Sequence, residues 1–475
     1  MVFSSVVFLA YFLPVFLLVY NILPHKFRNY WVLLASVVFY AWGAPKFIFV
    51  VIGTIAVDFY IVKKMFLSDN AKLRKRLLGI SVVLKIGLLV YFKYVNFFID
   101  NVNGILVSLD MGEVHWIKVA LPVGISFFIF QAVTYSVDVY RKVCPPLKNI
   151  ADYLMYILLF PQLIAGPIVR YKTIADQITD RKEDETIDNK LLGLYRFIIG
   201  LSKKLLIANV LGAEADRVFA MTEIQLTTPA AWVGILAYTF QIYFDFSGYS
   251  DMAIGLGRMM GFKFPENFNN PYISQNITEF WRRWHMTLGQ WMRDYLYIPL
   301  GGNRVSMNRM YFNLWLVFLL SGLWHGAAWN FVIWGAFHGL FLILDRLFLL
   351  KFFEKIGKYP SIIITFFVTI IGWVIFRSES IEQIGFFTKT LFSGKTNMQI
   401  FHVSDKFWWI LAFAILFSFI TLFRWGMKTE KYIFYREKLT GKQHLFMSFV
   451  ALILFVLSYS SMVSSGFNPF IYFRF

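Results

Sequence analysis

Residues 311–340 read Tyr-Phe-Asn-Leu-Trp-Leu-Val-Phe-Leu-Leu-Ser-Gly-Leu-Trp-His-Gly-Ala-Ala-Trp-Asn-Phe-Val-Ile-Trp-Gly-Ala-Phe-His-Gly-Leu and decide the class of this protein. The stretch is apolar enough for a lipid bilayer, yet it contains the ionisable imidazole of His325. A polar side chain in hydrocarbon is costly unless it has a partner or lines a wet cavity, so an intramembrane histidine is a candidate functional residue. The alternative is a neutral histidine in a purely structural hydrogen bond. The stretch alone leaves both roles open.

The rest of the chain has the composition of a membrane protein. Of its 475 residues, 58% are hydrophobic and 20% are aromatic, and the mean hydropathy is +0.59. A soluble core of this size would not bury so much apolar surface, whereas bilayer-spanning helices would. We therefore expect an all-α polytopic membrane protein with about ten to twelve transmembrane helices. The apolar stretches of spanning or near-spanning length are 3–23, 29–42, 45–62, 77–99, 117–138, 153–169, 191–211, 229–247, 311–328, 331–350, 361–377, 407–425 and 444–463.

Glycine and proline interrupt several of these stretches. The segment Gly43-Ala-Pro45 predicts a tight hairpin. Pro161 and the pair Gly166-Pro167 break the sixth stretch, so the sequence fits a re-entrant or bent segment as well as a clean span. We expect one membrane domain over residues 1–475, in which 170–190 is a charged connector.

Basic residues cluster in short tracts between the apolar segments. The formal charge is +18, and no nucleic-acid-binding motif accompanies it. Short loops rich in lysine and arginine stay on the cytoplasmic side of a membrane. Residues 63–76 and 424–442 are such loops, so we expect the N-terminus and the C-terminal tail 464–475 to be extracytoplasmic. By the same reasoning, loops 100–116 and 378–405 fall on the outer side.

Residues 276–300 predict one amphipathic helix that starts at Asn276 and ends before Pro299. Its apolar stripe recurs at three- and four-residue steps and comprises Trp281, Trp284, Leu288, Trp291 and Tyr295. The arginines around the stripe are Arg282, Arg283 and Arg293. They either anchor an interfacial helix at lipid headgroups or bind an anionic, phosphate-bearing cosubstrate from the cytoplasm. His285 lies among them, and both a structural and a catalytic role are open to it.

Other ionisable residues in apolar sequence also need partners. For Asp245 and Asp251 we expect a salt bridge between helices rather than proton transfer. His338 has no polar partner near it in the sequence, so we expect it to be structural or close to a site. In a continuous helix His325 and His338 would lie on similar faces, but Gly326 and Asn330 predict a break between them. No metal-binding spacing of histidine, cysteine or carboxylate is present. The single cysteine, Cys144, excludes an internal disulfide.

Three motifs in this part of the chain resemble those of the membrane-bound O-acyltransferase family. They are Arg282-Arg-Trp-His285, Trp291-Met-Arg-Asp-Tyr-Leu-Tyr-Ile-Pro-Leu-Gly-Gly-Asn-Arg304 and Ser321-Gly-Leu-Trp-His-Gly-Ala327. Further similar segments are 1–5, 39–42, 121–127, 161–167, 244–251 and 468–475. The resemblance covers nearly the whole chain, with its core in 240–345. Within the family, the sequence most resembles a bacterial branch. This branch contains the membrane subunits of alginate O-acetylase and relatives that act on peptidoglycan or other cell-wall glycans.

This resemblance implies both a fold and a reaction. The family fold is a ring of helices around a thin, funnel-shaped centre, with re-entrant and interfacial helices and a tunnel that joins the two faces. The invariant histidine of the family corresponds to His325, and its second characteristic polar residue corresponds to His285. In this branch the acyl group is acetyl, the location is the bacterial cytoplasmic membrane, and a separate extracytoplasmic SGNH-esterase-like protein usually completes transfer to a polysaccharide.

Together, these lines predict an O-acetyltransferase that uses cytoplasmic acetyl-CoA. The phosphates of acetyl-CoA would bind to Arg282, Arg283 and Arg293. His325 would be the general base toward an acceptor hydroxyl, while His285 would orient the thioester or bind the developing oxyanion.

Several alternatives stay open at this stage. The acceptor is a sugar, a partner side chain or a tyrosine such as Tyr472. The family branch that transfers D-alanine to teichoic acid shares both histidines, so the resemblance indicates acyl transfer and leaves D-alanyl open as the acyl group. A glycan or lipid transporter would also place histidines and carboxylates within a membrane, although the chain lacks the internal repeats that transporters often show. A non-catalytic scaffold would instead recruit an esterase through residues 468–475.

Overall fold

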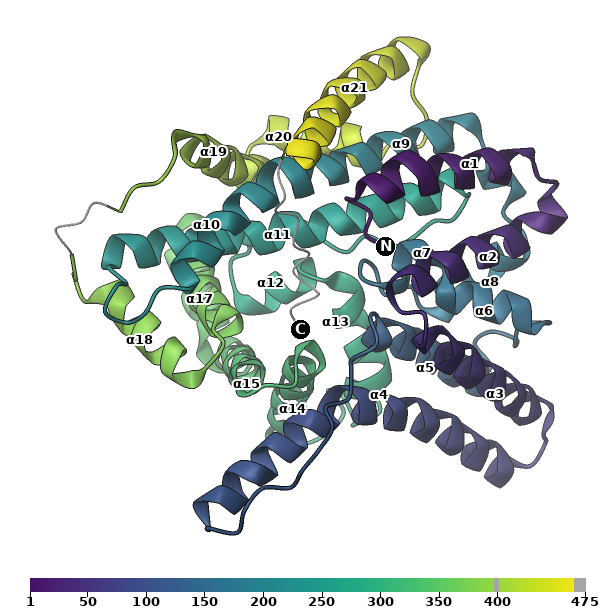
Figure 1. The fold of residues 1–475 in the computed structure, drawn as a ribbon, viewed down its shortest axis with the longest axis horizontal. Helices are drawn as coiled ribbons and strands as arrows, with labels where there is room; N and C mark the ends of the chain where they lie inside the picture. Colours follow the sequence, from purple (N-terminus) through teal and green to yellow (C-terminus); the bar gives the residue numbers. More distant parts are fainter. Residues whose placement is uncertain (397–400, 465–475) are drawn as a thin grey trace. The chain divides into compact units, whose positions relative to one another are not determined.

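The computed structural model describes residues 1–396 and 401–464, which form helices and connecting loops without a strand (Figure 1). This confirms the all-α prediction. The helices divide into two compact units. The first comprises Met1–Thr186 and Met260–Phe264, and the second comprises Ile187–Met259 and Pro265–Phe475. The expectation of one membrane domain stays a prediction.

The first unit confirms two predicted interruptions. Its elements are η1 (Val7–Phe12), α1 (Leu13–Ile22), α2 (His25–Gly43), α3 (Phe47–Leu67), α4 (Ala71–Ser108), α5 (Ile125–Tyr140), α6 (Ile150–Leu158), α7 (Phe160–Leu163), α8 (Tyr171–Thr179) and η2 (Lys182–Asp184). The hairpin at Gly43-Ala-Pro45 connects α2 to α3. The stretch 153–169 is divided between α6, the one-turn helix α7 and a loop, so it is not a clean span. The connector 170–190 contains α8 and is therefore partly helical.

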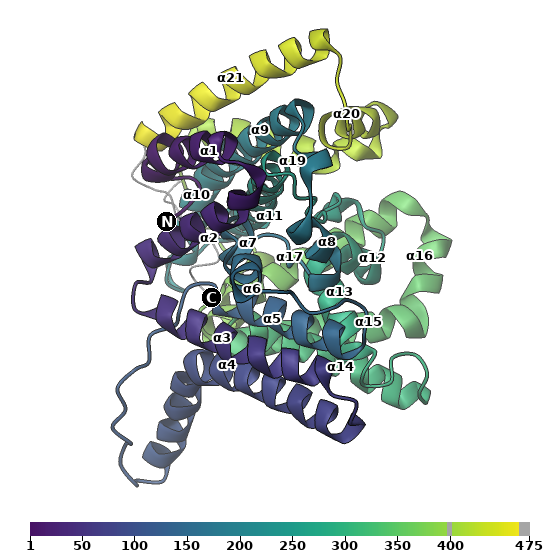
Figure 2. The same cartoon turned by 90° about the vertical axis from the view of Figure 1, so that its right-hand side faces the viewer.

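A buried ion pair joins helices of the first unit. Lys85 of α4 and Asp58 of α3 have no exposed side-chain surface, and 2.9 Å separates Lys85 Nζ from Asp58 Oδ2. The hydroxyls of Ser81 and Tyr153 donate to the two oxygens of the same carboxylate, at 2.5 and 2.6 Å. Lys85 also donates to Ser136 of α5. Figures 1 and 2 show α3 and α4 side by side along this contact.

The second unit contains the candidate site. Its elements are α9 (Ile187–Ser202), η3 (Lys203–Ala208), α10 (Asn209–Phe219), α11 (Thr228–Met259), η4 (Pro271–Ile273), α12 (Ile277–Arg283), α13 (Met286–Met292), η5 (Arg293–Tyr297), α14 (Met307–His325), α15 (Trp329–Leu344), η6 (Asp345–Leu349), α16 (Leu350–Ile356), α17 (Lys358–Arg377), α18 (Ile381–Phe392), α19 (Asp405–Phe419), η7 (Ile420–Leu422), α20 (Arg424–Phe434) and α21 (Gly441–Ser464). Helix α11 is buried over most of its length and contacts α9, α10 and α17.

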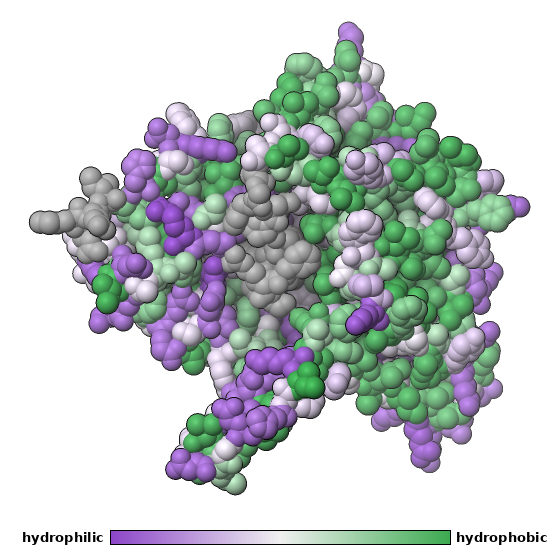
Figure 3. All heavy atoms as spheres, viewed as in Figure 1, coloured by the Kyte–Doolittle hydropathy of each residue, from purple (hydrophilic) through white to green (hydrophobic). Residues whose placement is uncertain are grey.

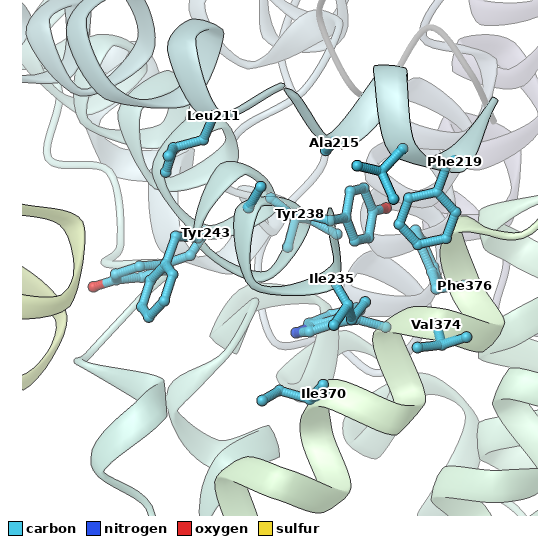
Figure 4. Packing of buried hydrophobic residues seen from close by; sticks show 14 of the residues in the cluster. Leu211, Ala215, Phe219, Ile235, Tyr238, Tyr243, Ile370, Val374 and Phe376 are labelled. Carbon is cyan, nitrogen blue, oxygen red and sulfur yellow. The ribbon is translucent and has the colours of Figure 1, made fainter. Parts of the chain in front are cut away.

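The hydrophobic core of the second unit lies where α10, α11 and α17 meet. Figure 4 shows Phe219 of α10, Tyr238 of α11 and Phe376 of α17 gathered in this contact. Phe376 also reaches the site, because its ring centroid lies 5.4 Å from that of His325. The core therefore fixes one wall of the site.

Helices α14 and α15 pack unusually closely, and two glycines make this possible. A Cβ on Gly322 would collide with the carbonyl oxygen of Phe331, and one on Gly335 would collide with that of Phe318. Because neither glycine has a side chain, the two backbones touch. This contact fixes the short segment between the helices, and His325 lies directly before that segment, at the end of α14.

Within residues 1–396 and 401–464, five helices are long and apolar enough to cross a membrane. They are Ala71–Ser108, Trp329–Ile356, Lys358–Arg377, Asp405–Leu422 and Gly441–Ser464. Val7–Ile22 and Ile125–Tyr140 are shorter apolar helices. Apolar side chains also cover much of the surface over α2 and α3, as expected for contact with lipid (Figure 3). The predicted ten to twelve crossings, which include shorter and bent segments, stay a prediction.

Candidate active site

His325 lies at the break between α14 and α15. It is the last residue of α14, Gly326 is extended, and α15 begins at Trp329, so the break expected near Gly326 is confirmed. The His325 side chain is buried, and its ring centroid lies 4.9 Å from that of Trp324 and 5.2 Å from that of Trp334. Aromatic side chains therefore enclose the imidazole.

His285 corrects the prediction of one continuous helix over 276–300. The predicted start is confirmed, because the Asn276 side chain accepts a hydrogen bond from the backbone N–H of Glu279. However, α12 ends at Arg283 and α13 begins at Met286. His285 stands between them with φ 43° and ψ 52°, in the left-handed region that few non-glycine residues adopt. Such a conformation persists only where the surroundings hold it.

Asn267 holds this break in place. Its backbone oxygen accepts from Met286 N at 2.9 Å. Its side-chain oxygen accepts from the Thr287 hydroxyl at 2.9 Å and from Thr287 N at 3.3 Å, while its amide donates to the Ser250 hydroxyl of α11. The N–H groups at the start of α13 thus bond to Asn267 rather than to a preceding helical turn. This contact explains why the helix breaks at His285.

The break directs the His285 ring toward His325. The two ring centroids are 6.5 Å apart, and Phe246 of α11 lies 4.7 Å from His285. The His285 side chain is buried, and neither ring nitrogen has a hydrogen-bond partner among residues 1–396 and 401–464. Burial, with a smaller contribution from the nearby His325, holds the pKa of His285 well below its usual value of 6.5. His285 is therefore neutral at physiological pH.

The three predicted phosphate-binding arginines have different surroundings. Arg283 pairs with Glu279 at 2.8 Å, and Arg293 pairs with Asp294 at 2.8 Å. Arg282 is exposed, and it has no ion-pair partner in the part of the chain that the structure describes. Of the three, Arg282 is thus the one whose charge no neighbouring carboxylate offsets.

Asp245 and Asp251 of α11 form ion pairs with neighbouring helices. Asp245 pairs with Lys204 of η3 at 2.9 Å. Asp251 pairs with Arg196 of α9 at 2.9 Å and with Lys203 at 2.6 Å. The expected salt bridges are confirmed, and they join α9 and η3 to α11.

His338 contacts Trp334, the residue that also contacts His325. Its ring centroid is 5.0 Å from those of both Trp334 and Trp281, and its side chain is buried. This agrees with the expectation of a residue close to the site. We did not identify Trp334 or Asn267 from the sequence. In the sequence, Trp334 looks like any tryptophan that faces lipid. The residues that Asn267 contacts, Thr287 and Ser250, are each about twenty positions from it along the chain.

Two predicted features lie beyond what the structure tests. Among the described residues, no group of three or more histidine, cysteine or carboxylate side chains is placed to hold a metal ion. Tyr472 and the tail segment 468–475 lie outside the described residues.

The profile of the membrane-bound O-acyltransferase family matches residues 60–382, which include both histidines. The chain belongs to this family. It is 47% identical over 383 residues to the probable alginate O-acetylase AlgI of Pseudomonas aeruginosa, covering 80% of this chain and 73% of that one. To the protein of the same name from Pseudomonas putida it is 40% identical over the full length of both chains. The peptidoglycan O-acetyltransferase of Helicobacter pylori is 38% identical over 81% of this chain and 78% of its own.

Family membership establishes the reaction class. The protein is a multi-pass membrane O-acyltransferase. Its paired histidines therefore lie in an enzyme in which an acyl group is moved to a hydroxyl.

Proposed function

We propose that the protein transfers an acetyl group from cytoplasmic acetyl-CoA for O-acetylation of an extracytoplasmic polysaccharide. The observation that supports this most is the pair of buried imidazoles, His325 and His285, whose ring centroids are 6.5 Å apart. A relative matched over the full length of both chains is named a probable alginate O-acetylase, and one matched over 81% of this chain is named a peptidoglycan O-acetyltransferase. The polymer is therefore an alginate-like exopolysaccharide, peptidoglycan or another cell-wall glycan.

The two histidines would divide the chemistry between them. His325 acts as the general base and takes the proton of the acceptor hydroxyl as that oxygen attacks the thioester carbonyl. His285 is neutral, so one of its ring nitrogens keeps a hydrogen and donates to the carbonyl oxygen of the acyl group. Neither nitrogen of His285 has a hydrogen-bond partner in the described part of the chain, which leaves that donor available to the substrate.

Binding of the donor would use the arginine cluster. Arg282 is exposed and unpaired among the described residues, so it is the main candidate to contact the phosphates of CoA. Arg283 and Arg293 form ion pairs with Glu279 and Asp294, which offset their positive charge. They would therefore contribute less to phosphate binding unless those ion pairs open. The pantetheine arm would then extend toward His325.

Transfer also requires an orientation and a partner. The basic tracts 63–76 and 424–442 support a cytoplasmic-membrane protein with both termini outside. The donor therefore approaches from one face and the polymer from the other. An extracytoplasmic SGNH-esterase-like protein would complete transfer to the sugar.

Replacing His325 tests this function. We expect His325→Ala to lower polysaccharide O-acetylation on the order of 10²- to 10⁴-fold, the usual contribution of a general base. The measurement is ester-linked acetate on the polymer, normalised to the amount of variant in the membrane. His402→Ala is the matched control, because His402 is an exposed histidine of the same unit. Wild-type acetylation in the His325→Ala strain would overturn the proposal.

The alternative functions give different results in the same strains. A transporter would move its cargo without consuming thioester, so release of CoA thiol by membranes supplied with acetyl-CoA separates the two. A scaffold would need residues 468–475 and tolerate His325→Ala. D-alanyl transfer would show as no incorporation from acetyl-CoA and as amine-bearing esters on the polymer.

A further inference from the structure

Trp334 of α15 is a buried residue whose polar group the proposed mechanism does not use. Its side chain is 1% exposed. Its indole Nε1–H has no acceptor among residues 1–396 and 401–464. A buried N–H without an acceptor costs about 1–3 kcal/mol, so the fold retains this group against its own stability. An acceptor that arrives with the substrate would remove that cost.

The position of Trp334 points to the site. Its ring centroid lies 5.2 Å from that of His325, with 85° between the two planes. The other described rings around it are those of Phe376 at 5.0 Å, His338 at 5.0 Å, Trp281 at 5.4 Å and Trp373 at 6.3 Å. Trp281 also has a buried indole N–H without an acceptor among the described residues, but its ring contacts there are with Trp334, His338 and two phenylalanines. Trp334 is therefore the tryptophan on α15 that touches the proposed base directly.

We propose that Trp334 Nε1–H donates a hydrogen bond to the carbonyl oxygen of the acyl thioester, with His285 as the second donor. The proposal rests on the proposed function and names a further catalytic residue for it. An indole N–H suits this role because it is a donor only and cannot compete with His325 for the proton. Two donors on one oxygen form the arrangement that stabilises the tetrahedral intermediate of acyl transfer.

The steps of the reaction show when this contact acts. As His325 takes the hydroxyl proton, the acceptor oxygen bonds to the acyl carbon and the carbonyl electron pair moves onto the carbonyl oxygen. That oxygen becomes an oxyanion, and its hydrogen bonds to Trp334 and His285 strengthen. When the carbonyl reforms, the carbon–sulfur bond breaks and the His325 imidazolium returns its proton to the departing thiolate. The products are the ester and the CoA thiol.

An isosteric replacement tests the hydrogen bond without removing the ring. In 3-benzothienylalanine a sulfur atom replaces the indole N–H, and amber suppression places it at position 334 of the full-length protein. We expect kcat to fall on the order of 10²-fold, the usual loss for one oxyanion donor, while KM for acetyl-CoA stays nearly constant. The apparent pKa in the pH profile of kcat/KM should also stay unchanged, because the base is still His325.

The same replacement at Trp232 of α11 is the control. The Trp232 indole already donates to the Leu391 carbonyl oxygen at 3.0 Å, and a wild-type kcat is expected there. Unchanged kcat at position 334, or an equal loss at both positions, would overturn the proposal. A rise in KM alone would also contradict it, since that is the effect of lost substrate binding. Full loss in His325→Ala with full activity in the position-334 variant would remove only this inference, whereas activity in His325→Ala would remove the proposed function itself.

Discussion

The candidate site consists of the imidazoles of His325 and His285 and of Trp334, whose ring contacts both His325 and His338. The sequence indicated which residues belong to the candidate site, but it predicted less of their backbone conformation. His325 was visible as an ionisable group in apolar sequence, and its place at a helix break followed from Gly326. The left-handed conformation of His285 was not predictable, because a histidine between arginines and tryptophans fits a regular helix equally well.

The environment of His285 predicts a pH dependence of stability. Its pKa is lowered in the folded protein, so below its usual value of 6.5 the unfolded chain binds a proton that the folded chain does not. This group therefore destabilises the fold as the pH falls below 6.5, by up to about 1.4 kcal/mol per pH unit. Thermal unfolding in nanodiscs between about pH 5 and 7 measures the effect. The His285→Asn variant should lose less stability on acidification, because asparagine tolerates the left-handed backbone and does not titrate. An identical pH dependence in both proteins would contradict this account.

At the scale of elements, side-chain contacts between distant segments shape the site. The amphipathic pattern over 276–300 correctly predicted the apolar face, since Trp284, Leu288 and Trp291 are buried. It did not predict two helices, because the contact that separates them comes from Asn267, outside the stretch. Hydrophobic periodicity reports which face is buried and says little about a hydrogen bond from another segment.

Removing the Asn267 side chain should displace His285. Asn267→Ala loses the bonds to Thr287 and Ser250, and we expect a fall in acetylation on the order of tenfold, together with a stability loss of about 1–3 kcal/mol. Asn269→Ala is the matched control, because Asn269 is exposed and contacts Arg283 through backbone atoms. Acetylation per folded molecule and thermal unfolding measure both effects. Equal behaviour of the two variants would show that Asn267 does not position His285.

The buried pair Lys85–Asp58 should behave as one unit. Lys85→Met or Asp58→Asn alone disrupts a fully buried pair, and we expect a loss of about 3–5 kcal/mol for Lys85→Met, which leaves the carboxylate uncompensated. The double variant keeps an acceptor for Ser81 and Tyr153 and should recover part of that loss. Lys118→Ala, which breaks an exposed pair with Asp100, should have little effect. Unfolding in detergent measures the free energy of unfolding of each variant. A loss in the double variant equal to the sum of the losses in the two single variants would contradict the coupling.

At the scale of the whole molecule, composition and charge pattern predicted the most. The all-α fold and the membrane class followed from the amount of apolar sequence, and the family followed from motifs that span the chain. The buried pair Lys85–Asp58 was missed although each charge lies within an apolar stretch, which is the same signal that identified His325. The short or broken helices could not be counted as crossings from hydropathy, because neighbouring helices rather than lipid cover their polar groups.

The orientation is open to direct measurement. A Cys144→Ser background has no other cysteine, so single cysteines report their own side. Glu113→Cys, in the loop 100–116, should react with a membrane-impermeant maleimide applied to spheroplasts, whereas Lys75→Cys should react only after permeabilisation. Both positions are exposed, so burial would not hide either one. The reverse pattern would invert the proposed path of the acetyl group.

The central claim is that His325 drives acetyl transfer from a cytoplasmic thioester to a polymer. Sealed inside-out membrane vesicles supplied with acetyl-CoA labelled in the acetyl group test it most directly, with ester-linked label on the polysaccharide as the readout. The account predicts label in vesicles with the wild-type protein, and a labelling rate lower by on the order of 10²-fold or more with His325→Gln at equal protein and equal CoA binding. Wild-type labelling by His325→Gln would contradict it.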